Sequence, residues 1–230
     1  MADVTKGKPI LFSAPMVRAL LAGTKTQTRR VLPSAHPKFP KYNLLNPDLL
    51  VDKREVWFWD GVHERVGASY LLRYAPGDRL WVREQHSFPQ GWMDQPDAVQ
   101  IGQVFYPATA DAAFPSSYLR ERPQDHTRLR PSIHMPRWAS RLTLTVTEVR
   151  VQRLQEISEA DAVAEGINPC AEGARCPEGA HGACCGQYDP VGEYRDLWNS
   201  IHGQYAWHGN PWVRATTFTV AHRNIDQVHP

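Results

Sequence analysis

Residues 9–31 read PILFSAPMVRALLAGTKTQTRRV, and this stretch contains the pattern of a strand, a helix and a second extended segment. The apolar run Pro9–Phe12 predicts a short strand. Ser13 can cap a helix whose first turn contains Pro15, where the missing N–H of proline costs nothing. Gly23 is the kind of residue that ends a helix. The sequence therefore predicts one helix over about residues 14–22, between two extended segments.

The second extended segment, Thr24–Val31, is unusually polar. In a strand, side chains alternate between two faces. This alternation divides the side chains into two sets: Thr26, Thr28 and Arg30 on one face, and Gln27 and Arg29 on the other. Lys25 follows directly after the expected helix end. We take the run AGTKTQTRR (22–30) as the candidate functional centre, a small polar site.

The composition is that of an ordinary globular protein. The chain has 230 residues, of which 42% are hydrophobic and 22% charged, with a formal net charge of +2. This charge is too small to indicate nucleic-acid binding by bulk electrostatics. The basic residues are nevertheless clustered, in one group of Lys25, Arg29 and Arg30 and a second of Arg120, Arg122, Arg128, Arg130, Arg137 and Arg141.

No apolar stretch approaches the roughly 20 residues that span a bilayer, and residues 1–13 lack the apolar segment of a signal peptide. We therefore expect a cytoplasmic protein with no membrane partner. In a reducing compartment, metal ligation or free thiols are expected of the four cysteines rather than disulfides.

The rest of the chain alternates between regular elements and long irregular segments. Residues 33–75 predict an insertion with one hairpin at most, and residues 87–136 a second, proline-rich insertion. Between them, Pro76-Gly77-Asp78 predicts a turn that leads into a strand over 80–84.

The C-terminal half has clearer patterns. Arg141–Val151 predicts a strand whose inward parity slips near Glu148, which indicates a bulge or bend. Ser158 and Asp161 have the spacing of a capping box, for a helix that ends at Gly166. Asp189-Pro190 predicts the start of a last helix, with an apolar face formed by Tyr194, Leu197, Trp198 and Ile201. A final strand is expected over 212–220, and a loose tail from His222.

Together these elements predict an α+β fold: a small, mostly antiparallel β-barrel with flanking helices. We expect a single domain over residues 8–221, with insertions at about 33–75, 87–136 and 168–188 and a tail over 222–230.

The third insertion contains a compact cysteine cluster formed by Cys170, Cys176, Cys184 and Cys185, with His181 among them. A structural zinc ion held by Cys170, Cys176, Cys184 and His181 is one interpretation, and free thiols are the other. The spacings do not match the usual paired C-x(2–4)-C knuckles.

Three side chains form a plausible set for amide hydrolysis. A hydroxyl such as that of Thr28 needs an adjacent base. Lys25 can serve as that base if burial lowers its pKa, and the carboxylate of Glu165, near a helix end, can orient it or relay a proton. From spacing alone, the same residues also fit a strand threonine, a solvated lysine and a surface acid.

Four segments carry a family resemblance: residues 21–30 (LAGTKTQTRR), 77–84 (GDRLWVRE), 157–166 (ISEADAVAEG) and 210–213 (NPWV). In this order they resemble ASCH-domain proteins, small β-barrels of the PUA-like superfamily. The segment 132–141 (SIHMPRWASR) is similar to one in the longer, often phage-encoded type. The resemblance covers about 110 residues and leaves out the insertions.

The resemblance implies an activity. Small bacterial members of the family resemble amidohydrolases that remove the acyl group from N4-acetylcytidine. Their catalytic Lys, Thr and Glu correspond in this sequence to Lys25, Thr28 and Glu165. Arg30 matches a family arginine. The expected partner is a modified nucleoside, and no cofactor is required for catalysis. As further substrate-binding candidates we take three residues in the other family-like segments: Trp81, Glu84 and His134.

Alternatives stay open at this point. Trp81 can stack a base or pack in the core. The nucleophile is either Thr28 or an activated water. The arginine clusters also permit an RNA-binding module, and the same basic cleft permits a ribonuclease.

Overall fold

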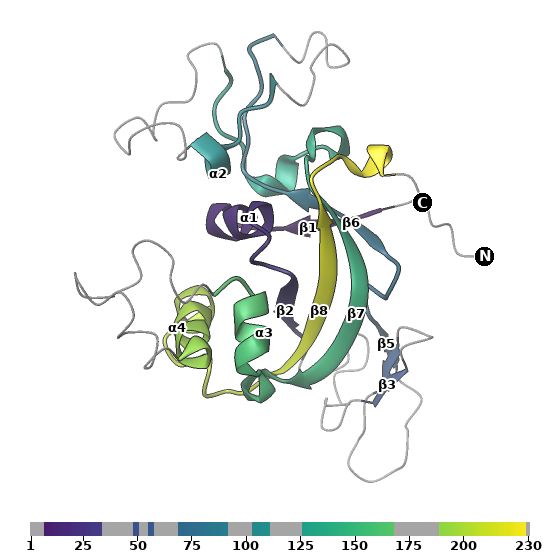
Figure 1. Cartoon of the computed structure of the whole chain (residues 1–230), viewed down its shortest axis with the longest axis vertical. Helices are drawn as coiled ribbons and strands as arrows, with labels where there is room; N and C mark the ends of the chain where they lie inside the picture. The colour runs from purple at the N-terminus through teal and green to yellow at the C-terminus, as the bar shows by residue number, and fades with distance from the viewer. Residues whose placement is uncertain are drawn as a thin grey trace. The chain divides into compact units, whose positions relative to one another are not determined.

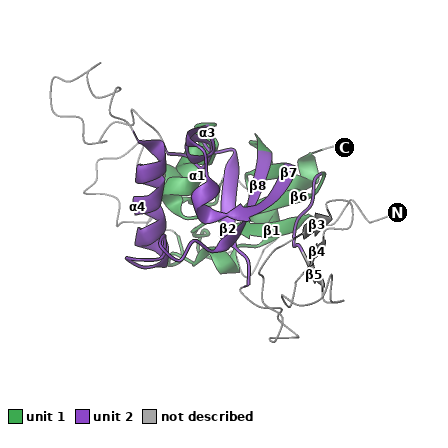
Figure 2. Ribbon diagram, turned by 90° about the horizontal axis from the view of Figure 1, so that it is seen from below, with its two compact units in different colours: residues 1–23, 77–146, 219–230 green, residues 24–76, 147–218 purple. Residues whose placement is uncertain are grey.

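The structure, a computed structural model, describes residues 7–33, 48–50, 55–57, 69–91, 103–110, 126–167 and 189–228. The chain forms two compact units, coloured in Figure 2. Unit 1 comprises residues 1–23, 77–146 and 219–230, and unit 2 comprises residues 24–76 and 147–218. Two long strands, β7 (Thr143–Arg153) and β8 (Trp212–Ala221), begin in one unit and end in the other. The expected domain limits, 8–221, stay a prediction.

The largest sheet has five strands in the order β1-β6-β7-β8-β2 (Figure 1). Its shorter members are β1 (Lys8–Leu11), β2 (Gln27–Val31) and β6 (Arg79–Arg83). Strands β1 and β6 run parallel, whereas β6 and β7, and likewise β2 and β8, run antiparallel. This mixed sheet with its helices confirms the α+β class. Within the described residues the sheet is open, with β1 and β2 at its ends, so the barrel stays a prediction.

The first helix follows from its sequence signals. Helix α1 (Ala14–Leu21) has Ser13 at its N-cap position and a proline in its first turn. The backbone of Ser13 is extended, but its side chain makes no capping hydrogen bond. Val17 and Leu20 are fully buried. Gly23, at φ +73°, takes the left-handed conformation that lets the chain leave the helix. The predicted strand and helix are therefore confirmed.

Strand β7 shows the predicted change of parity. Leu144 and Val146 are buried, Thr147 and Glu148 are both exposed, and Val149 is buried again. Two consecutive exposed residues mean that the inward face changes by one position, as the sequence indicated near Glu148.

Two helices of unit 2 also begin where predicted. Ser158 caps α3 (Glu159–Ala164) by accepting a hydrogen bond from the backbone N–H of Asp161. Asp189 caps α4 (Pro190–His202) by accepting one from Gly192. The predicted apolar face of α4 is only partly buried, because Ile201 is 54% exposed. None of the helices in the described parts of the chain has the length and apolar character needed to cross a membrane.

The first insertion contains more structure than predicted. Strands β3 (Asp48–Leu50), β4 (Glu55–Trp57) and β5 (Ser69–Leu71) form an antiparallel three-stranded sheet in the order β3-β4-β5. The expectation of one hairpin at most was wrong. Strands of three residues are too short to show the alternation by which a strand is recognised in sequence.

The second insertion contributes part of a core in unit 1. It contains the short helix α2 (Pro107–Ala110), and Phe88, Val104 and Tyr106 pack with Met135 and Ala139. Short 3-10 helices are found at Ser132–His134, Arg137–Ala139, Leu154–Glu156 and Ile225–Gln227.

The described part of the segment after His222, residues 223–228, is held by burial and hydrogen bonds, contrary to the predicted loose tail. Ile225 is buried. The side-chain amide of Asn224 donates hydrogen bonds to the carbonyls of Arg137, Trp138 and Ser140 at 3.0, 3.0 and 2.7 Å. These bonds attach the segment to unit 1, and a single asparagine gives no sequence signal for them.

Candidate functional site

A buried contact joins Lys25 and Glu165 within unit 2. The Lys25 ammonium donates to Oε2 of Glu165 at 2.8 Å and to the backbone carbonyl of the same residue at 2.7 Å, across a separation of 140 residues. The backbone fixes this meeting: Lys25 and Glu165 form an antiparallel bridge, and the N–H of Thr26 donates to the carbonyl of Ala164 at 2.8 Å. The two side chains are therefore brought together by main-chain pairing just before β2 and just after α3.

Burial changes the acid–base character of Lys25. The side chain of Lys25 is fully buried and that of Glu165 is 5% exposed. Burial lowers the pKa of Lys25, because an ammonium ion is poorly solvated away from water. The charge and hydrogen bond of Glu165 oppose this shift, while Arg30 and Arg29 add to it. The net result is a lysine with a lowered pKa, which is the property a lysine base requires.

Arg29 joins the same carboxylate from β2. Its side chain is fully buried, and it donates to Oε1 of Glu165 at 3.3 Å and to Oδ2 of Asp161 at 2.8 Å. Gln27, on the same face of β2, accepts a hydrogen bond from Arg29 and donates one to Asp161 at 3.0 Å. The two acids lie four residues apart on α3 and its C-cap, so that one arginine reaches both.

Asp161 also connects this network to β7. Its Oδ1 accepts a hydrogen bond from Arg150 at 2.8 Å. Burial would raise the pKa of Asp161, but hydrogen bonds from Arg150 and Gln27 and the charge of Arg29 lower it below its ordinary value. The charges thus alternate along a chain of five side chains: Arg150, Asp161, Arg29, Glu165 and Lys25.

Thr28 and Arg30 lie on the other face of β2, as the alternation predicts. Thr28 is 2% exposed, and its hydroxyl accepts a hydrogen bond from Arg30 at 3.1 Å. In the register with β8, Thr28 lies opposite Thr216, which is fully buried. Polar side chains therefore occupy both faces of the buried part of β2, Gln27 to Arg29, which core packing alone does not require.

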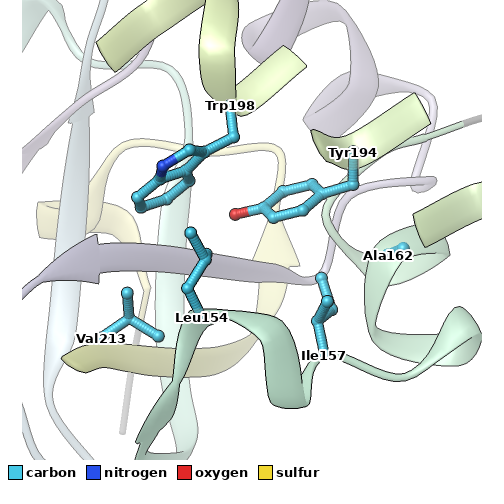
Figure 3. Packing of buried hydrophobic residues seen from close by; sticks show 6 residues of the cluster. All are labelled: Leu154, Ile157, Ala162, Tyr194, Trp198 and Val213. Carbon is cyan, nitrogen blue, oxygen red and sulfur yellow. The ribbon is translucent and has the colours of Figure 1, made fainter. Parts of the chain in front are cut away.

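Apolar packing holds α3 and α4 in place around these groups. Tyr194 and Trp198 of α4 pack against Leu154, Ile157 and Val213, with Ala162 of α3 in the same cluster (Figure 3). Tyr194 also lies under Arg29, with the guanidinium carbon 6.0 Å from the ring centre. Burial and the charge of Glu165 raise the pKa of Tyr194, so its hydroxyl stays neutral.

The other predicted substrate-binding residues belong to unit 1. Trp81 is 5% exposed, and the guanidinium of Arg83 lies 4.5 Å from its ring centre. Glu84 is buried and forms two hydrogen bonds with Arg141, at 2.8 and 2.9 Å. His134 is exposed at the end of its 3-10 helix. Their role in binding a substrate stays a prediction.

Sequence reasoning missed part of the network. Asp161 was interpreted only as a capping residue, Arg29 as a strand residue in a basic cluster with no assigned role, and Tyr194 only as part of an apolar helix face. Two signals were present: Gln27 and Arg29 share one face of a strand that is otherwise expected to pack, and Asp161 and Glu165 share one face of a helix.

The predicted zinc ligands Cys170, Cys176, Cys184 and His181 lie outside the described residues. Within the described ranges, no group of three or more His, Cys, Asp or Glu side chains is arranged to hold a metal ion.

Comparisons with protein-family models, with curated proteins and with solved structures give no significant match. The functional argument therefore depends on the residues and their geometry, together with the motif resemblance.

Proposed function

We propose that this protein is an amidohydrolase that removes the acyl group from N4-acylated cytosine nucleosides, in a longer ASCH-type, PUA-like barrel fold. The observation that carries the proposal is the buried contact of Lys25 with Glu165 at 2.8 Å. The motif resemblance selects this pair from the sequence, and the two residues are 140 positions apart. A contact of this kind costs desolvation energy and is a weak source of stability, which favours a chemical role.

In the proposed reaction, Lys25 in its neutral form accepts a proton from the nucleophile, which is the Thr28 hydroxyl or a water molecule. The nucleophile attacks the exocyclic amide carbonyl, and the proton passes to the departing N4 nitrogen of cytosine. Glu165 orients the lysine and relays the proton. Attack by Thr28 produces an acyl-threonine that water then hydrolyses, whereas attack by water releases the carboxylic acid directly. In this reaction Arg30 stabilises the oxyanion; its hydrogen bond to the Thr28 hydroxyl supports this role.

The RNA-binding alternative receives less support from the described residues. Two arginines of the second basic cluster already neutralise carboxylates: Arg141 pairs with Glu84, and Arg137 with Asp226 at 2.7 Å. Arginines compensated in this way contribute less to phosphate binding.

The test is incubation of the purified chain with N4-acetylcytidine, in which loss of the acylcytosine absorbance is followed. We expect turnover by the wild type, and a decrease of roughly 10²-fold or more in Lys25→Ala and Glu165→Gln. Lys8→Ala is the matched control, because Lys8 also pairs with a carboxylate at 2.8 Å, but at a side chain that is 34% exposed.

No deacylation by a folded wild-type chain would exclude the proposal, and equal activity in all three variants would exclude the assigned residues. Salt-sensitive RNA binding without deacylation would favour the RNA-binding module, and RNA cleavage that depends on Lys25 would favour the ribonuclease.

A further inference from the structure

Arg29 is the side chain that connects Glu165 to Asp161. Its two terminal nitrogens point to different acids, Nη1 to Oε1 of Glu165 and Nη2 to Oδ2 of Asp161. The other oxygen of Glu165, Oε2, is the one that Lys25 contacts. One carboxylate is therefore shared between two buried cations, with one oxygen for each.

We propose that Arg29 is a positioning residue of this site: it holds Oε1 of Glu165 and thereby keeps the carboxylate divided between Arg29 and Lys25. This inference rests on the proposed function, in which Lys25 is the base. Arg29 itself need not touch the substrate, since its two terminal nitrogens are directed at Gln27, Asp161 and Glu165.

The geometry requires an arginine. A guanidinium is planar and presents its donors in a fixed fork, so it can span two carboxylates that lie on successive turns of one helix. A lysine at the same position has a single nitrogen, which cannot reach Asp161 and Glu165 in the same directions. A conservative change at residue 29 therefore keeps the charge but loses the bridge.

The sharing has a consequence for Lys25. The charged groups that act on Lys25 are Glu165 from the end of α3, and Arg29 and Arg30 from β2. If Arg29 is removed, the Glu165 carboxylate loses its contact with Arg29 and keeps the one with Lys25. A nearby positive charge is also lost, so the pKa of Lys25 rises. If Asp161 is neutralised instead, Arg29 is held more by Glu165 and a negative charge is lost, so the pKa of Lys25 falls.

The test compares Arg29→Met, Arg29→Lys and Asp161→Asn with the control Lys8→Met. Lys8 also pairs with a carboxylate, that of Asp78 at 2.8 Å, but this pair is not part of the network around Glu165. Two quantities are measured in each variant: the pH dependence of kcat/KM on N4-acetylcytidine, and the titration of Lys25 by NMR of lysine labelled with ¹³C at Cε, assigned with Lys25→Met.

In Arg29→Met we expect the acid limb of kcat/KM to move to higher pH, with a decrease of about threefold to tenfold below neutral pH and less above it. In Asp161→Asn the acid limb of kcat/KM should move to lower pH. This result is measured in a separate variant, so it does not depend on the folding of Arg29→Met. Arg29→Lys should leave the pKa of Lys25 close to that of the wild type, because the positive charge is kept. It should lower kcat with little change in KM. Lys8→Met should leave both measurements close to wild type.

A Lys25 titration that is unchanged in Arg29→Met and Asp161→Asn, or that moves in the same direction in both, would overturn the inference, because a residue that only stabilises the fold does not shift it in opposite directions. If the wild type does not deacylate the substrate, the proposed function fails, and the NMR titration alone still decides whether Arg29 divides Glu165 between the two cations.

Discussion

The contact between Lys25 and Glu165 predicts a specific order of stability losses. Its atoms are 2.8 Å apart, and at an effective dielectric constant of about 20 this distance corresponds to an attraction of roughly 6 kcal/mol between unit charges. Desolvation offsets much of this attraction in the intact pair. Removing one partner leaves the other buried without it, which typically costs about 3–5 kcal/mol.

The two single variants should differ. Glu165→Gln removes a carboxylate that contacts both Lys25 and Arg29, whereas Lys25→Met leaves Glu165 with Arg29 at 3.3 Å. We therefore expect Glu165→Gln to be the more destabilising change, by roughly 3–5 kcal/mol, which lowers Tm by about 6–20 °C in a chain of this size. The double variant should cost less than the sum, with a coupling of about 0.5–3 kcal/mol.

The assay is thermal and urea unfolding followed by tryptophan fluorescence for the wild type, both single variants and the double variant. The pair Lys8 and Asp78 is the control, since its N–O distance is also 2.8 Å but its side chains are 34% and 15% exposed. The same double-mutant cycle at Lys8 and Asp78 should give a coupling energy below about 1 kcal/mol. The reasoning is refuted if Lys25→Met is the more destabilising variant, or if the two changes are additive.

Two further predictions concern the other charged side chains. Arg141→Met should destabilise the protein by about 3 kcal/mol, because it leaves the buried carboxylate of Glu84 without this partner. Arg137→Met should cost less than about 1 kcal/mol in the same unfolding assay, because the side chains of Arg137 and Asp226 are 31% and 60% exposed. Equal losses of stability in the two variants would contradict the role of burial. Since the folded-state pKa of Asp161 is lowered, its contribution to stability is present above its ordinary value of 3.8 and is lost as the pH falls through the folded pKa. The difference in unfolding free energy between wild type and Asp161→Asn, measured from pH 7 to pH 2, should therefore decrease below about pH 4, and a difference that stays constant would show that Asp161 does not have this role.

Local chemistry was sufficient to predict several elements from the sequence. The limits of α1 follow from a proline in its first turn and a glycine after its end, and the starts of α3 and α4 from Ser158 and Asp189 as caps. The change of parity in β7 could be predicted because eleven residues show a periodicity clearly. In each case the signal and the structure it specifies lie within a few residues of each other.

Elements of three residues and single anchoring side chains were not predicted. The sheet formed by β3, β4 and β5 is too short for periodicity to identify its strands. The ordering of the segment after His222 depends on Asn224, whose partners are 84 to 87 residues away in the chain. A polar residue in a terminal segment looks the same in sequence whether it meets solvent or three backbone carbonyls.

The candidate site divides in the same way. The sequence by itself determined that residues 22–30 concentrate hydroxyls and cations on an alternating strand, and the motif resemblance selected Lys25, Thr28 and Glu165. Only the tertiary structure decided that Lys25 meets Glu165, because an antiparallel bridge between residues 140 positions apart depends on the packing of α3. The same packing turns Asp161 and Glu165 together toward Arg29, and burial then lowers the pKa of Lys25. Long-range contact and exclusion of water are properties of the folded chain, so no local pattern specifies them.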